Sequence, residues 1–128
     1  MMREQPTSIQ LIQSVVDFLR DDLMPKLDGL TAFHARVAVS VLEIAQRELE
    51  TGPRADAAEL AGLRALLDMD GTPEELNKEL CERIARGEMS ADTPGLVQHL
   101  FACAMDKLAV DQPGYSTFVR LKEQQQQK

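Results

Sequence analysis

Two carboxylates that stand close together are the side chains best suited to chemistry in this sequence. They are Asp68 and Asp70, in the run Asp68-Met69-Asp70-Gly71-Thr72. Paired carboxylates can divide the work of a nucleophile and a general acid or base. They could also begin a calcium loop that ends at Glu79, but the sixth place of that loop requires glycine and holds Pro73. The spacing therefore does not support a calcium site.

The order of residues 68–72 resembles the DxDGT signature of haloacid-dehalogenase-type phosphatases. In that family the first aspartate is the nucleophile and the second the general acid or base, at the end of a parallel strand. Here residues 57–67 have few β-branched side chains and a helical spacing of leucines. We therefore expect a helix end, a turn at Gly71 and a new helix beginning at Thr72-Pro73.

His99 and Cys103 lie one helical turn apart, which is a spacing that can present two metal ligands. The chain has only two histidines and two cysteines, with no CxxC or HExxH motif. We therefore expect a surface histidine beside a half-buried thiol, with Cys81 and Cys103 both reduced. The sequence predicts no catalytic residue, no metal and no cofactor.

A very apolar helix is predicted over residues 31–50. At about 100° per residue, its polar residues form one narrow stripe, which includes Arg36, Glu43 and Arg47. Apolar residues cover most of the remaining circumference, so we expect this helix to be the central one.

Two ionisable residues interrupt the apolar arc of that helix. They are His34 in its first turn and Glu48 in its last, roughly 20 Å apart along the axis. A buried ionisable group needs a partner, because burial without one costs several kcal/mol. Lys107 and Arg54 are candidate partners for Glu48. Such groups either fix the register of packed helices or line a polar pocket.

Capping and periodicity predict the remaining elements. Thr7 and Gln10 form a capping box, and Pro25 kinks or ends the helix that follows. Helices are then expected over 31–50, stopped by Gly52-Pro53, and from Asp56, Thr72 and Thr93, with a short one over 115–122. The prediction is an all-α antiparallel helical bundle of five to six helices, with a single domain over 1–122 and a frayed polar tail over 123–128.

Charge and composition exclude some partners. The net charge is −7, and Lys and Arg form no run, which argues against nucleic acid and against an anionic membrane. Residues 1–5 lack the apolar region of a signal peptide, and no apolar stretch approaches the ~20 residues that span a bilayer. We expect a cytoplasmic protein.

Four segments together resemble a known family. They are Ala32–Ala38 continuing through Arg47–Glu50 and Gly52-Pro53, then Leu76–Cys81 with Ile84 and Gly87, then Asp106–Leu108, and Asp111–Pro113 with Tyr115. They are similar to a family of small helical bacterial proteins classed as a domain of unknown function. Ser40 stands where that family's pattern leads us to expect asparagine.

The resemblance implies a role beside an enzyme. Members are encoded next to an aminoglycoside-phosphotransferase-like kinase and an acyl-CoA dehydrogenase. The expected function is therefore a non-catalytic accessory subunit of a kinase that phosphorylates hydroxyacyl-CoA esters in the breakdown of short hydroxy or keto acids. No catalytic residue is implied.

Two hypotheses follow from these observations. A partner subunit needs an apolar surface patch, for which Met105, Ala102 and Ala109 are weak candidates. The alternative is a helical bundle that binds an acyl-CoA, or its acyl group, in a pocket near His34. The sequence leaves self-association open.

Overall fold

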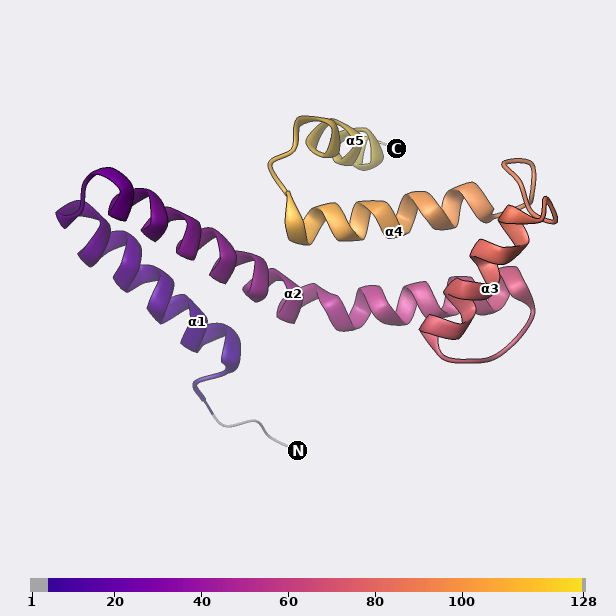
Figure 1. The fold of residues 1–128 in the computed structure, drawn as a ribbon, viewed down its shortest axis with the longest axis horizontal. Coiled ribbons are helices and arrows are strands. Elements are labelled where there is room, and N and C mark those ends of the chain that lie inside the picture. The colour runs from indigo at the N-terminus through magenta and orange to yellow at the C-terminus, as the bar shows by residue number, and fades with distance from the viewer. Residues whose placement is uncertain (1–4, 128) are drawn as a thin grey trace. The chain divides into compact units, whose positions relative to one another are not determined.

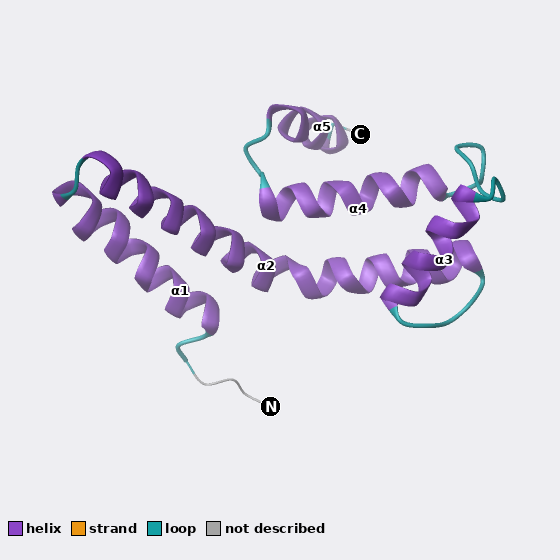
Figure 2. Ribbon diagram, in the orientation of Figure 1, coloured by secondary structure: helices purple, strands orange, loops and turns teal. Residues whose placement is uncertain are grey.

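The computed structural model describes residues 5–127, and within them the chain is all-α. Five α-helices are formed and no strand, which confirms the predicted fold class (Figures 1 and 2). The helices are α1 (Ser8–Asp17), α2 (Gly29–Leu67), α3 (Pro73–Ala85), α4 (Leu96–Asp111) and α5 (Ser116–Gln126). Contacts divide the chain into two compact units, Met1–Gly52 and Pro53–Lys128. The predicted single domain over 1–122 stays a prediction, and residues 1–4 and 128 lie outside the described part.

Unit 1 is a helical hairpin. α1 begins with the predicted Thr7–Gln10 capping box and continues as a π-helical segment, Phe18–Leu23, and a 3₁₀ turn, Met24–Lys26. Pro25 lies in that turn, and the extended backbone at Leu27 ends the helix as expected.

The two arms of the hairpin run antiparallel and contact each other along one side (Figure 1). The Gln46 amide donates to the Ile9 carbonyl (3.2 Å) and to Gln13 Oε1 (2.8 Å), and Arg20 pairs with Glu43 at 3.2 Å. The buried side chains of this unit, among the described residues, are Val16, Ala32 and Val39. The hairpin therefore has a small core with few buried side chains.

Unit 2 contains the rest of α2 together with α3, α4 and α5. Its core is a cluster of buried side chains from α2, α3, α4 and the loop before α4: Leu63, Leu67, Leu76, Leu80, Met89 and Leu96. α4 runs antiparallel to the second half of α2, with Gly95 near Leu66 and His99 near Gly62 (Figure 1). Phe118 of α5 is buried as well.

One predicted boundary is wrong. α2 does not stop at Gly52-Pro53 or restart at Asp56, but runs unbroken from Gly29 to Leu67 with Pro53 inside it. A proline inside a helix costs about 3 kcal/mol. Residues 54–67 are rich in Ala and Leu, which are strong helix formers, and this propensity together with packing in unit 2 outweighs the penalty.

The other boundaries agree more closely with the sequence. α3 begins at the predicted capping box of Thr72 and Glu75 and ends before Gly87, which has a φ of +77°. α4 begins three residues later than expected, because the Thr93 hydroxyl accepts from the Ser90 amide in a preceding turn. α5 extends through Gln126, into the segment that was expected to be a frayed tail.

Candidate functional site

The two ionisable residues in the apolar arc of α2 are not buried. His34 and Glu48 are both exposed in unit 1, so neither is the buried ionisable group that its place in the apolar arc suggested. The reason is that α1 covers the side of α2 that carries Ala32 and Val39, and the apolar arc lies on the opposite side. α2 is therefore not a central helix along this half. Whether His34 and Glu48 have a function stays a prediction.

Lys107, the expected partner of Glu48, is also on the surface. Its side chain is 80% exposed and its ammonium pairs with Asp111, one turn later on α4, at 3.5 Å. Among the described residues no polar or charged side chain is buried. Within unit 2, Lys107 is therefore an exposed cation paired along its own helix, and a pairing with Glu48 of unit 1 stays a prediction.

The polar stripe of α2 partly holds the hairpin together. Glu43 is half-buried and pairs with Arg20 of the π-helical segment. The Arg36 guanidinium lies 5.9 Å from the centre of the Phe33 ring, one turn earlier on the same helix. Arg47 is half-buried. The stripe therefore contains Glu43, which pairs with Arg20 across the hairpin, and Arg36, which is an exposed cation.

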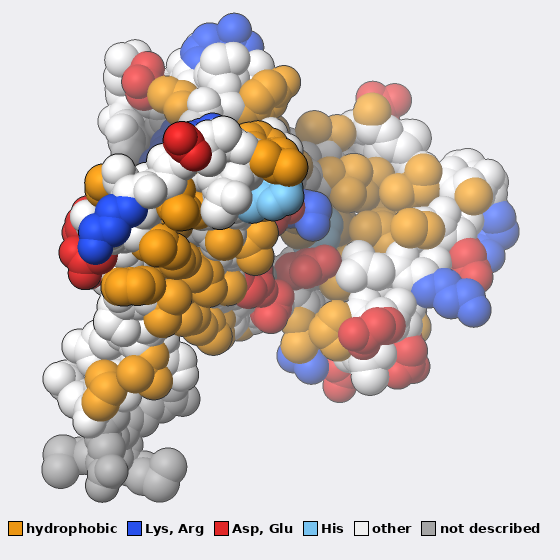
Figure 3. Space-filling view, turned by 60° about the vertical axis from the view of Figure 1, so that its left-hand side comes forward, with side chains coloured by type: hydrophobic (Ala, Val, Ile, Leu, Met, Phe, Trp, Pro, Cys, Tyr) orange, Lys and Arg blue, Asp and Glu red, His pale blue; other side chains and the backbone are white. Residues whose placement is uncertain are grey.

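Exposed apolar side chains gather on three helices of the described part. α1 and the segment after it present Leu11, Val15 and Phe18, and α2 presents Leu30, Phe33, Val37 and Val41. α4 presents Val97, Leu100, Phe101 and Ala104, which we call the α4 stripe. Figure 3 shows hydrophobic side chains gathered broadly on the near face of unit 1. Apolar surfaces of this extent mark interaction sites.

The patch expected from the sequence lies on the wrong side of α4. Met105 is 9% exposed and Ala109 is half-buried, so Ala102 is the one exposed member of the expected patch. Val97 and Phe101 are exposed on another side of α4.

Asp68 and Asp70 follow the end of a helix, as expected. Asp68 has a φ of +50° directly after α2, and Asp70 pairs with Arg64 at 2.8 Å and accepts from the Gly71 amide. A left-handed residue at this place is a common way to end a helix. The structure accounts for both carboxylates as parts of a turn.

His99 and Cys103 contact each other on α4, with 3.6 Å between Nε2 and Sγ. Burial raises the pKa of the Cys103 thiol, and the nearby carboxylates of Glu59 and Asp106 raise it further. A raised pKa keeps the thiol protonated and poorly nucleophilic. No group of three or more His, Cys, Asp or Glu with metal-site geometry occurs among the described residues.

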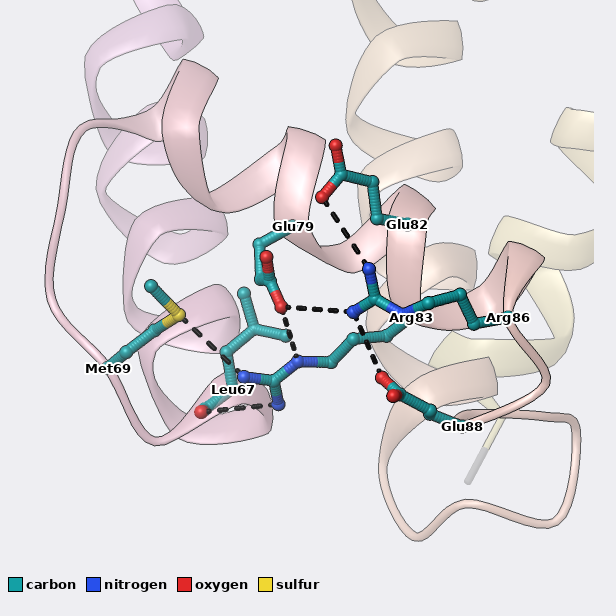
Figure 4. Close-up of polar contacts among 7 residues, drawn as sticks. All are labelled: Leu67, Met69, Glu79, Glu82, Arg83, Arg86 and Glu88. Atoms are coloured by element: carbon teal, nitrogen blue, oxygen red, sulfur yellow. Dashed lines mark hydrogen bonds and ion pairs between the residues drawn. The ribbon is translucent and has the colours of Figure 1, made fainter.

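A network of ion pairs covers the end of α3 (Figure 4). Glu79 accepts from Arg83 at 2.9 Å and pairs with Arg86 at 3.5 Å, and Arg86 also reaches Glu82 and Glu88. The hydrogen bond from Arg83 lowers the pKa of Glu79, with further lowering from the two positive charges.

Arg83 also connects α3 to the end of α2. Its Nη1 donates to the Leu67 carbonyl (3.4 Å) and its Nη2 lies 3.8 Å from the Met69 sulfur (Figure 4). A cation at a helix C-terminus is favourable because the last carbonyls lack partners. The network therefore has a structural role, which the sequence pattern alone did not reveal.

These features define a small all-helical chain with exposed apolar faces. Its sequence places it in a family: the model described as a domain of unknown function (DUF6285) matches residues 25–115, so the chain belongs to that family. No curated protein and no solved structure matches the chain. Across the described residues, no helix combines the length and apolar character that crossing a membrane requires.

Proposed function

We propose that this chain is a non-catalytic partner subunit that binds another protein through the α4 stripe. The members of the stripe follow one another along the sequence at spacings of three, one and three residues, so they share one side of α4: Val97, Leu100, Phe101 and Ala104. Val97, Leu100 and Phe101 are 49%, 45% and 40% exposed. This exposed stripe is the observation that carries the proposal.

Other positions of α4, beside the stripe and away from it, already pack within unit 2. Leu96 belongs to the core cluster of unit 2, and His99 packs against Gly62 of α2. The stripe residues are more exposed than these packed positions. Phe101 provides the aromatic anchor that protein interfaces favour at their centre.

The extent of the family favours this surface over that of α1. The family match covers residues 25–115, which includes all of α4 and none of α1. A binding surface that serves the family must lie within the matched residues. The Leu11–Phe18 group lies outside them.

The identity of the partner is inferred from the resemblance described above. We infer a phosphotransferase-like kinase that acts on hydroxyacyl-CoA in short hydroxy or keto acid catabolism. Such a subunit would stabilise or complete the kinase, and its exposed apolar stripe would be buried in the complex.

The alternative, an acyl-CoA pocket near His34, needs that side chain to face the inside of a bundle. His34 is exposed, and its ring lies 5.9 Å from that of the exposed Phe33. No observation favours the pocket over the partner surface.

The test is binding between the purified chain and the kinase encoded beside it, measured by calorimetry and co-elution. We expect a complex that Phe101→Lys weakens by roughly thirtyfold or more, as loss of a central anchor does. Gln98→Lys is the matched control, because Gln98 is exposed on the same helix away from the stripe. Independent elution of the two proteins at micromolar concentration would contradict the proposal.

A further inference from the structure

The first half of α2 carries a second apolar surface with a regular spacing. Its members alternate at intervals of four and three residues, and we call them the α2 seam: Leu30, His34, Val37, Val41, Ile44, Glu48 and Thr51. Positions 34, 41 and 48 are seven apart, as are 30, 37, 44 and 51. This is the heptad repeat by which one helix packs along another.

Most of the seam is exposed in unit 1, and only its members Ile44 and Thr51 are half-buried. Leu30, Val37 and Val41 are 69%, 45% and 57% exposed, whereas Ala32 and Val39, on the opposite side of the helix, are buried. The seam spans 21 intervals, or roughly 32 Å at 1.5 Å per residue. A heptad seam of this length requires a second helix to bury it.

The two ionisable residues of the seam indicate which helix covers it. His34 and Glu48 occupy equivalent heptad positions, seven residues before and seven after Val41. Two antiparallel copies of α2 that cross at Val41 bring each His34 to the level of the other copy's Glu48. The same His34–Glu48 contact therefore forms twice. Two parallel copies would instead place His34 beside His34 and Glu48 beside Glu48 in an apolar seam.

We propose that two copies of this chain pair through the α2 seam, antiparallel and about a twofold axis near Val41. The interface is isologous, so each residue pair occurs twice. It explains why two ionisable side chains interrupt the apolar side of α2: they set the direction and register of pairing. The pairing is independent of the kinase proposal, which uses the α4 stripe.

The seam is tested by the mass of the full chain in sedimentation experiments over a range of concentrations. We expect a dimer for the wild-type chain and a monomer for Val41→Lys, which places a cation at the centre of the seam. Ser40→Lys adds the same charge at the neighbouring exposed position outside the seam, and it should remain a dimer. A monomeric wild type, or a dimeric Val41→Lys, overturns the proposal.

The register is tested by exchanging the two ionisable residues. His34→Glu and Glu48→His each place like groups opposite one another, and each should weaken the dimer roughly tenfold. The double exchange His34→Glu/Glu48→His restores both pairs and should recover the wild-type dissociation constant, whereas the control Glu50→His should change it by less than about twofold.

Circular dichroism of each variant reports whether the helices form. The double exchange introduces no side-chain type that the seam lacks, so it remains decisive even where Val41→Lys fails to fold. A double variant that dimerises as weakly as the single variants overturns the antiparallel register. Kinase binding by Val41→Lys, measured separately, distinguishes failure of this proposal from failure of the α4 proposal.

Discussion

Units 1 and 2 are stabilised to very different degrees by their own contacts. Nine of the twelve buried hydrophobic side chains of the described part lie in unit 2 and three in unit 1. Unit 2 has a continuous core, a capping box at Thr72 and the ion-pair network of α3. Unit 1 relies on Val16, Ala32 and Val39 and on a few polar contacts between its arms.

The difference shows where additional contacts are needed. A helix with an apolar face must bury it against another element. Unit 2 does so internally along α2, α3 and part of α4, whereas the hairpin leaves most of the α2 seam exposed. The hairpin therefore depends more on association than unit 2 does.

The largest effect is expected in the core of unit 2. Leu76 is 0% exposed, and Leu76→Ala should lower the free energy of unfolding by about 2 to 5 kcal/mol, because it removes packed methyl groups and leaves a cavity. Leu30→Ala is the matched control and should cost less than about 0.5 kcal/mol in dilute solution, since Leu30 is 69% exposed. Urea denaturation measures both. Equal losses for the two variants would contradict the contrast between the units.

A smaller effect is expected where α2 and α4 approach closely. A Cβ on Gly62 would lie 2.8 Å from Cε1 of His99, so Gly62→Ala should cost about 1 to 3 kcal/mol through overpacking. Gly114→Ala is the control, because no atom lies within 4 Å of the added Cβ. Adding His99→Ala should recover most of the loss. If the double variant recovers none of the lost stability, the His99 ring is not what limits how closely α2 and α4 approach.

The smallest effect is expected from the surface network on α3. The pKa of Glu79 is lowered below its ordinary value of 4.5, so its charged form stabilises the folded state. That contribution is present above pH 4.5 and is lost as the pH falls through the lowered pKa. Glu79→Gln should therefore reduce the melting temperature slightly at pH 7 and make its decline on acidification shallower. Glu50→Gln, outside the network, should leave the pH profile unchanged.

Local signals predicted much of the fold. The capping boxes at Thr7 and Thr72 depend on hydrogen bonds within one turn, so the sequence alone located both helix starts. The continuity of α2 was missed, because Gly52 and Pro53 disfavour a helix locally and the surrounding segments outweigh them. Local propensity is a weak guide where long flanking helices compete with it.

The candidate site was harder to predict than the fold. The helical period showed that His34 and Glu48 lie within an apolar arc, but not which side of α2 would be covered. Burial depends on where α1 packs, and the side chains buried in the hairpin are Val16, Ala32 and Val39 rather than those of the longest apolar run. The seven-residue spacing of positions 34, 41 and 48 was present in the sequence and could have indicated the seam.

The most direct test of the account is hydrogen exchange of the backbone amides in each unit as protein concentration is raised. If the hairpin is covered by a second copy, protection of residues 30–51 should rise with concentration, while protection of the unit 2 core around Leu63 and Leu76 should stay constant. Protection of residues 30–51 that does not depend on protein concentration would contradict the pairing of two copies through the α2 seam.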